Sequence, residues 1–184
     1  MIKGFAVYLL AAVVVFLQPC VTAEVLEKDM KFGDTVFSRG TQVGYYKSGK
    51  VYWVHPKRPV TVNGLRAAAN YNIVFYPSGK VKQIRLASQT VIDGKKCAAN
   101  YLTELYESGK LYIWPLAEPT TIEGIKLHNR DFAILSEDGN LMGMMIHQQV
   151  TIKGQKYMPN AEIYLNPDGT VKEVKQLESG VHYY

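Results

Sequence analysis

Residues Tyr71 to Gly94 read YNIVFYPSGKVKQIRLASQTVIDG, and this stretch decides the fold. Two runs rich in apolar residues flank Pro77-Ser78-Gly79-Lys80, and an Asp93-Gly94 pair closes the stretch. Pro at the second position and Gly near the end are typical of a type I turn. Asp-Gly between apolar runs favours a two-residue hairpin. The stretch therefore predicts short antiparallel strands joined by tight turns.

The same pattern recurs every thirty residues. Two interleaved glycine series carry it: Gly49, Gly79, Gly109, Gly139 and Gly169, and Gly64, Gly94, Gly124 and Gly154. A third position holds Gly40, Asn70, Asn100 and Asn160, with Arg130 after Asn129 in the fourth unit. Gly and Asn tolerate positive φ, so we expect three sharp turns in each unit. With Asp34 as a degenerate start, the units are 34–63, 64–93, 94–123, 124–153 and 154–183.

The runs between the turns alternate in polarity as half-buried strands do. Ile73 and Phe75 align with apolar residues in later units, with Thr103 as a polar exception, and no part of the chain after the N-terminal segment shows a sustained helical period. One such unit cannot bury its apolar face alone, but stacked units can. We therefore predict an all-β domain of five tandem repeats, residues 34–184, as an antiparallel β-meander or hairpin solenoid. A closed barrel or a five-bladed propeller is the alternative.

Residues 1–23 have the features of a secretory signal peptide. Lys3 precedes an apolar run from Phe5 to Leu17, Pro19 follows, and Val21-Thr22-Ala23 supplies short residues for cleavage. The run is too short to span a bilayer core of roughly 30 Å, so we expect a signal helix and a mature N-terminus at Glu24. Residues 24–33 would form a lead-in to the repeats. An uncleaved anchor is one alternative, and a lipoprotein acylated at Cys20 is another.

Composition agrees with an exported folded domain. The 184 residues are 47% hydrophobic and 20% charged, which excludes a disordered tail. Cleavage would leave Cys97 as the only cysteine, so no internal disulfide is expected, and we expect Cys97 to be a small buried apolar residue. The destination would be the periplasm, the cell surface or the extracellular medium. No transmembrane span is expected in the mature chain.

The hairpin centre Tyr46-Lys47-Ser48-Gly49-Lys50 resembles the centre of MORN and MORN-2 type repeats. The thirty-residue pattern as a whole is similar to uncharacterised repeats of exported bacterial proteins. The resemblance implies an exported, tandem-repeat β protein. It implies no active site.

The sequence contains no motif for catalysis, cofactor binding or metal binding. The four histidines, His55, His128, His147 and His182, do not have metal-ligand spacing. Nucleophile-elbow and phosphate-loop motifs are lacking, and the acidic residues are spread thinly along the chain. The net charge of +5 and pI near 9.1 come without a basic cluster, so nucleic acid is not an expected partner.

Two ladders are the candidate binding face. Tyr46, Tyr76 and Tyr106 share one repeat position, and Lys50, Lys80 and Lys110 share another. Tyrosine combines a stacking face with a hydroxyl, which suits a glycan or a protein, whereas lysine attracts anionic polymers. The competing interpretation is that the tyrosines pack between strands and the lysines are solvated. We therefore expect a non-enzymatic binding or scaffolding protein of the cell envelope, with an envelope protein or glycan as partner. The alternatives are an enzyme acting on cell-wall glycans and a purely structural envelope component.

Overall fold

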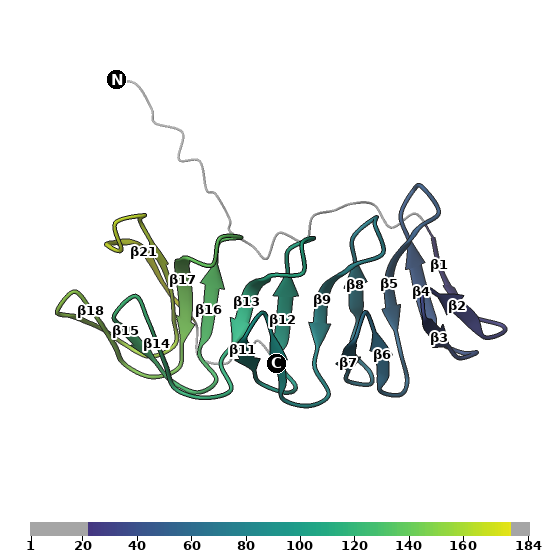
Figure 1. Cartoon of the computed structure of the whole chain (residues 1–184), viewed down its shortest axis with the longest axis horizontal. Helices are drawn as coiled ribbons and strands as arrows, with labels where there is room; N and C mark the ends of the chain where they lie inside the picture. The colour runs from purple at the N-terminus through teal and green to yellow at the C-terminus, as the bar shows by residue number, and fades with distance from the viewer. Residues whose placement is uncertain (1–21, 178–184) are drawn as a thin grey trace, which may run out of the picture.

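A computed structural model describes residues 22–177 and shows an all-β protein without a helix in that range. Most of the predicted signal peptide lies outside the described residues, as does the end of the last unit from residue 178, including His182. The predicted β-meander is confirmed. Figure 1 shows its strands in sequence order from one end of the molecule to the other.

The main element is an eleven-stranded antiparallel sheet with neighbouring strands in chain order. Its edges are β1 and β21, which do not pair with each other, so the sheet is open and the barrel and propeller alternatives are wrong. The strands are β1 (Thr22–Val25), β4 (Gln42–Tyr45), β5 (Val51–His55), β8 (Ile73–Phe75), β9 (Val81–Arg85), β12 (Leu102–Leu105), β13 (Leu111–Pro115), β16 (Phe132–Leu135), β17 (Leu141–Ile146), β20 (Ala161–Leu165) and β21 (Val171–Gln176).

Five two-stranded hairpins form a second layer. Isolated bridges from Ala67 to Leu86 and from Cys97 to Leu116 join a hairpin strand to the end of a strand of the large sheet. Each unit therefore contributes two long strands and one short hairpin. The hairpin strands are β2 (Met30–Phe32) with β3 (Thr35–Phe37), β6 (Val60–Val62) with β7 (Leu65–Ala67), β10 (Thr90–Ile92) with β11 (Lys95–Cys97), β14 (Thr120–Ile122) with β15 (Ile125–Leu127), and β18 (Val150–Ile152) with β19 (Gln155–Tyr157).

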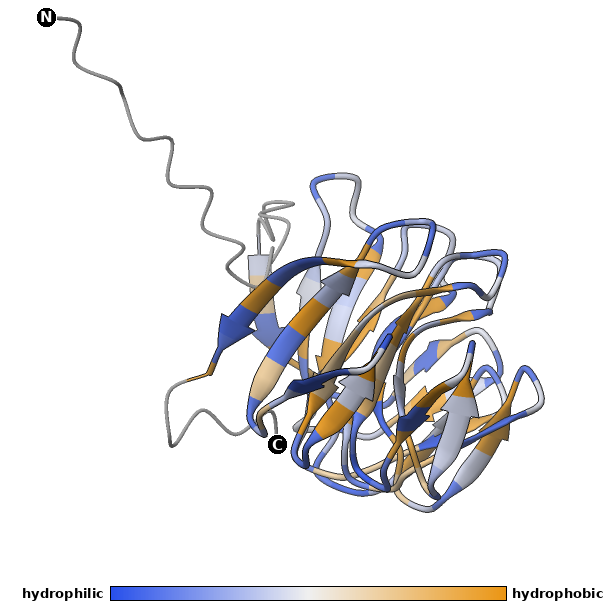
Figure 2. Cartoon of the chain, turned by 90° about the vertical axis from the view of Figure 1, so that its left-hand side faces the viewer, coloured by the Kyte–Doolittle hydropathy of each residue, from blue (hydrophilic) through white to orange (hydrophobic). Residues whose placement is uncertain are grey.

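The core lies between the large sheet and the hairpins. Equivalent residues of successive units stack there, as Val54, Ile84 and Met144 do on the sheet side. Trp114 occupies the same position, and its Nε1 donates a hydrogen bond to the carbonyl oxygen of Lys96 in β11 at 2.9 Å. Figure 2 shows apolar segments along the strands and hydrophilic residues at many of the turns. Stacking of equivalent side chains therefore continues the core from unit to unit.

The three predicted turn positions are confirmed. Gly79 and Gly109, at the ends of the long hairpins, have φ of 86° and 92°. Asn63 and the following glycine are both left-handed, which is the two-residue turn that suits the twist of a β-hairpin. Arg130 takes the third position with φ of 71°, although a long side chain is strained there.

The array begins earlier than the sequence pattern suggests. Residues 24–33, expected as a lead-in, include part of β1 and all of β2, and Leu26 is buried in the core. The predicted cleavage after Ala23 falls in the middle of β1. Processing at that peptide bond would therefore remove half of the first strand.

Candidate binding face

The large sheet has one face that the hairpins do not cover, and we call it the open face. Side chains alternate between the two sides of a strand, so residues next to core positions point to the open face. Trp53 precedes the core residue Val54, and Val74 lies between the core residues Ile73 and Phe75. The open face is therefore assigned from strand register.

A middle row of side chains crosses the open face in continuous register. Each member lies directly opposite the next on a neighbouring strand, about 4.5–5.5 Å apart at Cα. The row consists of Gly44, Trp53, Val74, Gln83, Glu104, Ile113, Ile134, Gly143, Tyr164 and Glu173.

A lower row lies two residues along each strand, towards the edge where the hairpins join. It combines polar groups near the N-terminal half with apolar groups further on. Its members are Gln42, His55, Asn72, Arg85, Leu102, Pro115, Phe132, Met145, Glu162 and Lys175.

The N-terminal half of the lower row presents polar groups beside an exposed aromatic ring. His55 Nδ1 lies 2.8 Å from Asn72 Oδ1. The Arg85 guanidinium lies over the Tyr71 ring, 4.4 Å from its centroid, and donates to the carbonyl oxygen of Asn100 at 3.1 Å. Tyr71 remains 41% exposed. This region therefore offers an aromatic ring together with hydrogen-bonding groups.

Glu104 is the carboxyl group at the centre of the open face. Gln83 Nε2 donates a hydrogen bond to its Oε1. Burial raises the pKa of Glu104, although the Gln83 hydrogen bond and the nearby Lys82 charge oppose that rise. The pKa of Tyr112 is also raised, by burial and then by the carboxylates of Glu104 and Glu162. The centre of the face is thus partly shielded from water.

A second apolar cluster lies on the open face near β16 and β17. Phe132, Ile134 and Met145 are buried but do not belong to the core between the layers. The Tyr101 ring packs edge-on against Phe132, 5.7 Å between centroids. A Cβ added at Gly143 would lie 3.3 Å from the Tyr164 ring and 2.7 Å from the carbonyl oxygen of Ile163. Aromatic rings therefore cover this part of the face.

The candidate tyrosines lie on the open face at its turn edge, two residues beyond the middle row. Each hydroxyl donates to a carbonyl of the next unit: Tyr46 to Phe75 at 2.5 Å, Tyr76 to Leu105 at 2.9 Å and Tyr106 to Leu135 at 2.8 Å. Tyr46 is only 9% exposed, and the other two are half-buried. Burial raises the pKa of Tyr46 to about 12. The structure thus brings the three together, but Tyr46 lacks the exposure that a ligand-contacting ring requires.

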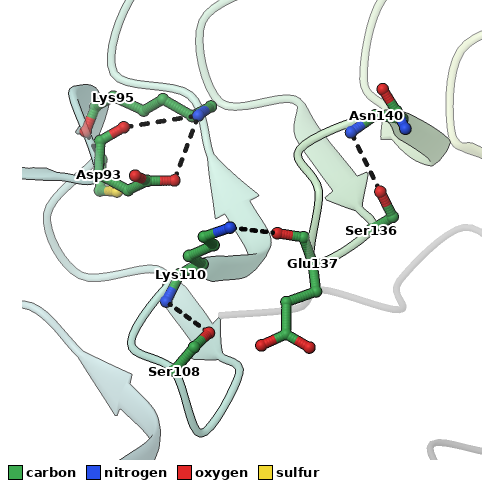
Figure 3. A network of polar contacts seen from close by, with 8 residues as sticks. Asp93, Lys95, Ser108, Lys110, Ser136, Glu137 and Asn140 are labelled. Atoms are coloured by element: carbon green, nitrogen blue, oxygen red, sulfur yellow. Dashed lines mark hydrogen bonds and ion pairs between the residues drawn. The ribbon is translucent and has the colours of Figure 1, made fainter.

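The candidate lysines also connect neighbouring units. Lys80 Nζ donates to the carbonyl oxygen of Glu107 at 2.9 Å, and Lys110 Nζ donates to that of Glu137 at 3.1 Å, the contact drawn in Figure 3. Lys50, at the equivalent position, is exposed. Each of the two bonded ammonium groups satisfies a turn carbonyl and keeps its charge at the surface. Each lysine also accepts, at its backbone carbonyl, a 2.8 Å hydrogen bond from the N–H of the tyrosine of the same turn, so the two ladders run side by side along the turn edge.

The described histidines lie at two separate places. His55 is on the open face, whereas His128 and His147 flank the fully buried Asp131. The backbone N–H groups of His128 and His147 donate to the Asp131 carboxylate at 2.7 and 2.8 Å. Within residues 22–177, no group of three His, Cys, Asp or Glu side chains is arranged to hold a metal ion. Asp131 therefore caps backbone donors inside the fourth unit.

Cys97 is fully buried, as predicted. Burial raises the pKa of its thiol to about 12. A thiol in this state is protonated at neutral pH and is a poor nucleophile.

Sequence reasoning missed most of the open face. Trp53 and Gln83 share one repeat position and Val74 and Glu104 share another, so the alignment of units does not bring the two sets together. Register does group them, and it follows from a β-bulge in the long hairpins that shifts the pairing by one residue. The bulge places Val51 and Val54 on the core side with two residues between them, so a strict period of two fails here.

Comparisons with protein-family models, curated proteins and solved structures give no match for this chain. Among the described residues there is no helix with the length and apolar character needed to cross a membrane.

Proposed function

We propose that this chain is an exported binding and scaffolding protein that holds a cell-envelope glycan along the open face of its sheet. The observation that carries the proposal is the middle row, which aligns Trp53, Val74, Gln83 and Glu104 on consecutive strands. Such a row offers a repeated set of contacts to an extended polymer.

The side chains on this face match the chemistry of sugars. Flat aromatic rings pack against the apolar faces of sugar rings, and Trp53 and Tyr71 present such rings. Amide, carboxyl and guanidinium groups bond to hydroxyls; Gln83 and Glu104 supply the first two in the middle row, and Arg85 supplies the third over the Tyr71 ring. An aromatic platform with a few convergent polar groups is the usual composition of a ligand site.

The predicted export supports an envelope ligand. The N-terminal 23 residues have the pattern of a signal peptide, and the net charge of +5 favours an anionic polymer. Cell-wall glycans that carry carboxylates or phosphates fit both features. A protein partner would use the same face but would be expected to require a larger apolar area.

The test is co-sedimentation of the exported, processed protein with purified insoluble peptidoglycan. We expect wild type to sediment, and Trp53→Ala and Tyr71→Ala to lose most of the binding, about tenfold or more each. Tyr71 is the cleaner site because its ring is 41% exposed, so its removal costs little packing beyond the contact with Arg85. Val91→Ala is the matched control, since Val91 is 62% exposed on the hairpin layer. Equal binding by all four proteins, or no binding by wild type, would contradict the proposal.

An enzyme acting on glycans is the second candidate, because Glu104 is a shielded carboxyl with a raised pKa. Glycosidases of the common type need a second carboxyl group about 5–9.5 Å away. The hydrogen-bond partner of Glu104 is the amide of Gln83. Release of soluble sugar from peptidoglycan by wild type, and its loss in Glu104→Gln, would favour the enzyme over the binding protein.

A further inference from the structure

The two edge strands of the large sheet are periodic equivalents. Thr22–Val25 and Lys172–Lys175 are separated by five thirty-residue repeats. Their pairing agrees: Glu24 lies opposite Val43, and Val174 lies opposite Ile163, which is the residue equivalent to Val43 four units later. Strand β21 therefore has the register and direction of β1, at the other end of the molecule.

The C-terminal edge exposes a residue that belongs to the core. At the position of Val174, the inner units carry Val54, Ile84, Trp114 and Met144, all buried under a hairpin. Val174 is 44% exposed, because no hairpin follows β21 within the described residues. An apolar residue at the end of a stacked core is thus left uncovered.

At the N-terminal edge, the hairpin is present but the strand beneath it lacks the apolar residue. The hairpin β2–β3 is in place there, with Met30 and Phe32 half-buried against the core. The strand beneath it is β1, which puts Glu24 where the other units have an apolar side chain. The Tyr45 hydroxyl donates to Glu24 Oε1 at 2.7 Å. A carboxylate therefore occupies the position that an apolar residue should fill.

Strand β1 is also weakly held. All four of its residues are exposed, and it pairs with the rest of the sheet only through β4. Cleavage after Ala23 would remove two of its four register pairs, Thr22 with Tyr45 and Ala23 with Gly44. Glu24 and Val25 would keep the other two pairs, next to Leu26, whose N–H donates to the carbonyl oxygen of Thr41 at 2.9 Å, so an incoming strand would have to displace only this two-residue remnant.

We propose that β21 of one copy replaces β1 in the next copy, which joins processed chains head to tail. By the register above, Val174 would lie opposite Val43 and beneath the β2–β3 hairpin, Glu173 opposite Gly44 and Lys175 opposite Gln42. Both defects disappear, because Val174 becomes covered and an apolar side chain replaces Glu24 under the hairpin. The contact uses different surfaces on the two copies and leaves a free end on each, so it builds linear filaments. Strand addition to an open sheet edge is an established mode of association.

The proposal rests on the proposed processing, but it does not depend on glycan binding. The first test is sedimentation velocity of the exported, processed protein over a range of concentrations. We expect a series of species that grows beyond dimers with concentration. A chain that begins at Thr22 keeps all of β1 and should associate at least tenfold more weakly.

Substitution of the exposed Val174 distinguishes the proposed pairing of β21 with β4 of the next copy from other modes of association. Val174→Lys should return the processed protein to monomers, since an ammonium group cannot enter the core. Its peptidoglycan binding should stay as in wild type, and so should its thermal unfolding at a concentration where wild type is also monomeric. Val91→Lys is the matched control on an exposed hairpin valine and should still form filaments. A chain that ends at Leu177 keeps all of β21 and should also form filaments.

Three results would overturn the proposal. One is a processed protein that is monomeric at its highest soluble concentration. Another is association that stops at dimers, which indicates pairing of β21 with its own copy. The third is unchanged association of Val174→Lys. Loss of glycan binding with filaments intact would instead affect only the proposed function.

Discussion

The hydroxyl of Tyr106 donates a hydrogen bond to the carbonyl oxygen of Leu135, 2.8 Å away and 29 residues further along the chain. Tyr76 and Tyr46 make the same contact one and two units earlier. Each bond crosses from one long hairpin to the next, so the tyrosine ladder fastens neighbouring units on the open face. The later units have Ser136 and Asn166 at this position, and their side chains bond within their own turns.

The first prediction is that Tyr106→Phe lowers the free energy of unfolding by about 0.5–1.5 kcal/mol, the usual net value of one hydrogen bond. The ring packing against Tyr112 stays, so the change isolates the hydroxyl. Urea unfolding measures the effect. Tyr112→Phe is the control, because the Tyr112 hydroxyl has no hydrogen-bond partner among residues 22–177. Equal stability of the two variants would show that the ladder does not fasten the units.

The second prediction concerns the left-handed turn at Gly109. Gly109→Val should destabilise the fold by roughly 1–3 kcal/mol, because a β-branched residue is strained at a φ of 92°. An added Cβ would meet no atom within 4 Å, so the loss would come from the backbone conformation alone. Gly109→Asn should lower the free energy of unfolding clearly less than Gly109→Val does, since Asn tolerates positive φ. Thermal unfolding that ranks the two variants equally would be inconsistent with this turn.

The third prediction is a stabilising change at Thr103. This side chain lies fully buried in the ladder of Val43, Ile73 and Ile163, and its hydroxyl has no hydrogen-bond partner. Thr103→Val keeps the shape and removes the orphaned hydroxyl, so the free energy of unfolding should rise by about 1 kcal/mol. Thr121→Val, on an exposed hairpin position, should change stability little. A destabilised Thr103→Val would mean that the hydroxyl is satisfied in solution.

The fourth prediction is a pH dependence that belongs to Glu104. Its pKa is raised in the folded state, mainly by burial, so the folded protein holds this proton over a pH range where the unfolded chain has lost it. The free energy of unfolding therefore decreases as pH rises from the ordinary glutamate pKa through the raised one. Glu104→Gln should remove that decrease, as measured by urea unfolding at about pH 4 and about pH 7. Glu107→Gln, at an exposed turn, should keep the wild-type pH dependence.

Much of the fold could be predicted from the sequence because its turns are chemically distinctive. Gly79, Gly109 and Asn63 each mark a left-handed backbone position, and their thirty-residue spacing gives the repeat. The start of the array was harder to place. The first small hairpin has Gly33 before Asp34, whereas later hairpins have their glycine one residue later in the turn. The series that starts at Gly64 therefore misses the first small hairpin, which is one unit earlier in the chain.

The open face could not be predicted in the same way. Burial of Tyr46 depends on the distance to Phe75 in the next unit, and the repeat pattern alone does not give that distance. The β-bulge moves Trp53 to the open face, so simple alternation from Val51 places it on the wrong side. Export and processing stay predictions from residues 1–23.

Glycan binding along the open face is tested most directly by the two tryptophans of the chain. Trp53 lies on the open face, whereas Trp114 is buried between the layers with its indole bonded to Lys96. The measurement is the pair of indole N–H signals in a ¹H–¹⁵N NMR spectrum, recorded while soluble peptidoglycan fragments are added to the processed protein. We predict that the Trp53 signal shifts in a saturable way and that the Trp114 signal stays in place. A Trp53 signal that does not move while the fragments bind would contradict glycan binding at the open face.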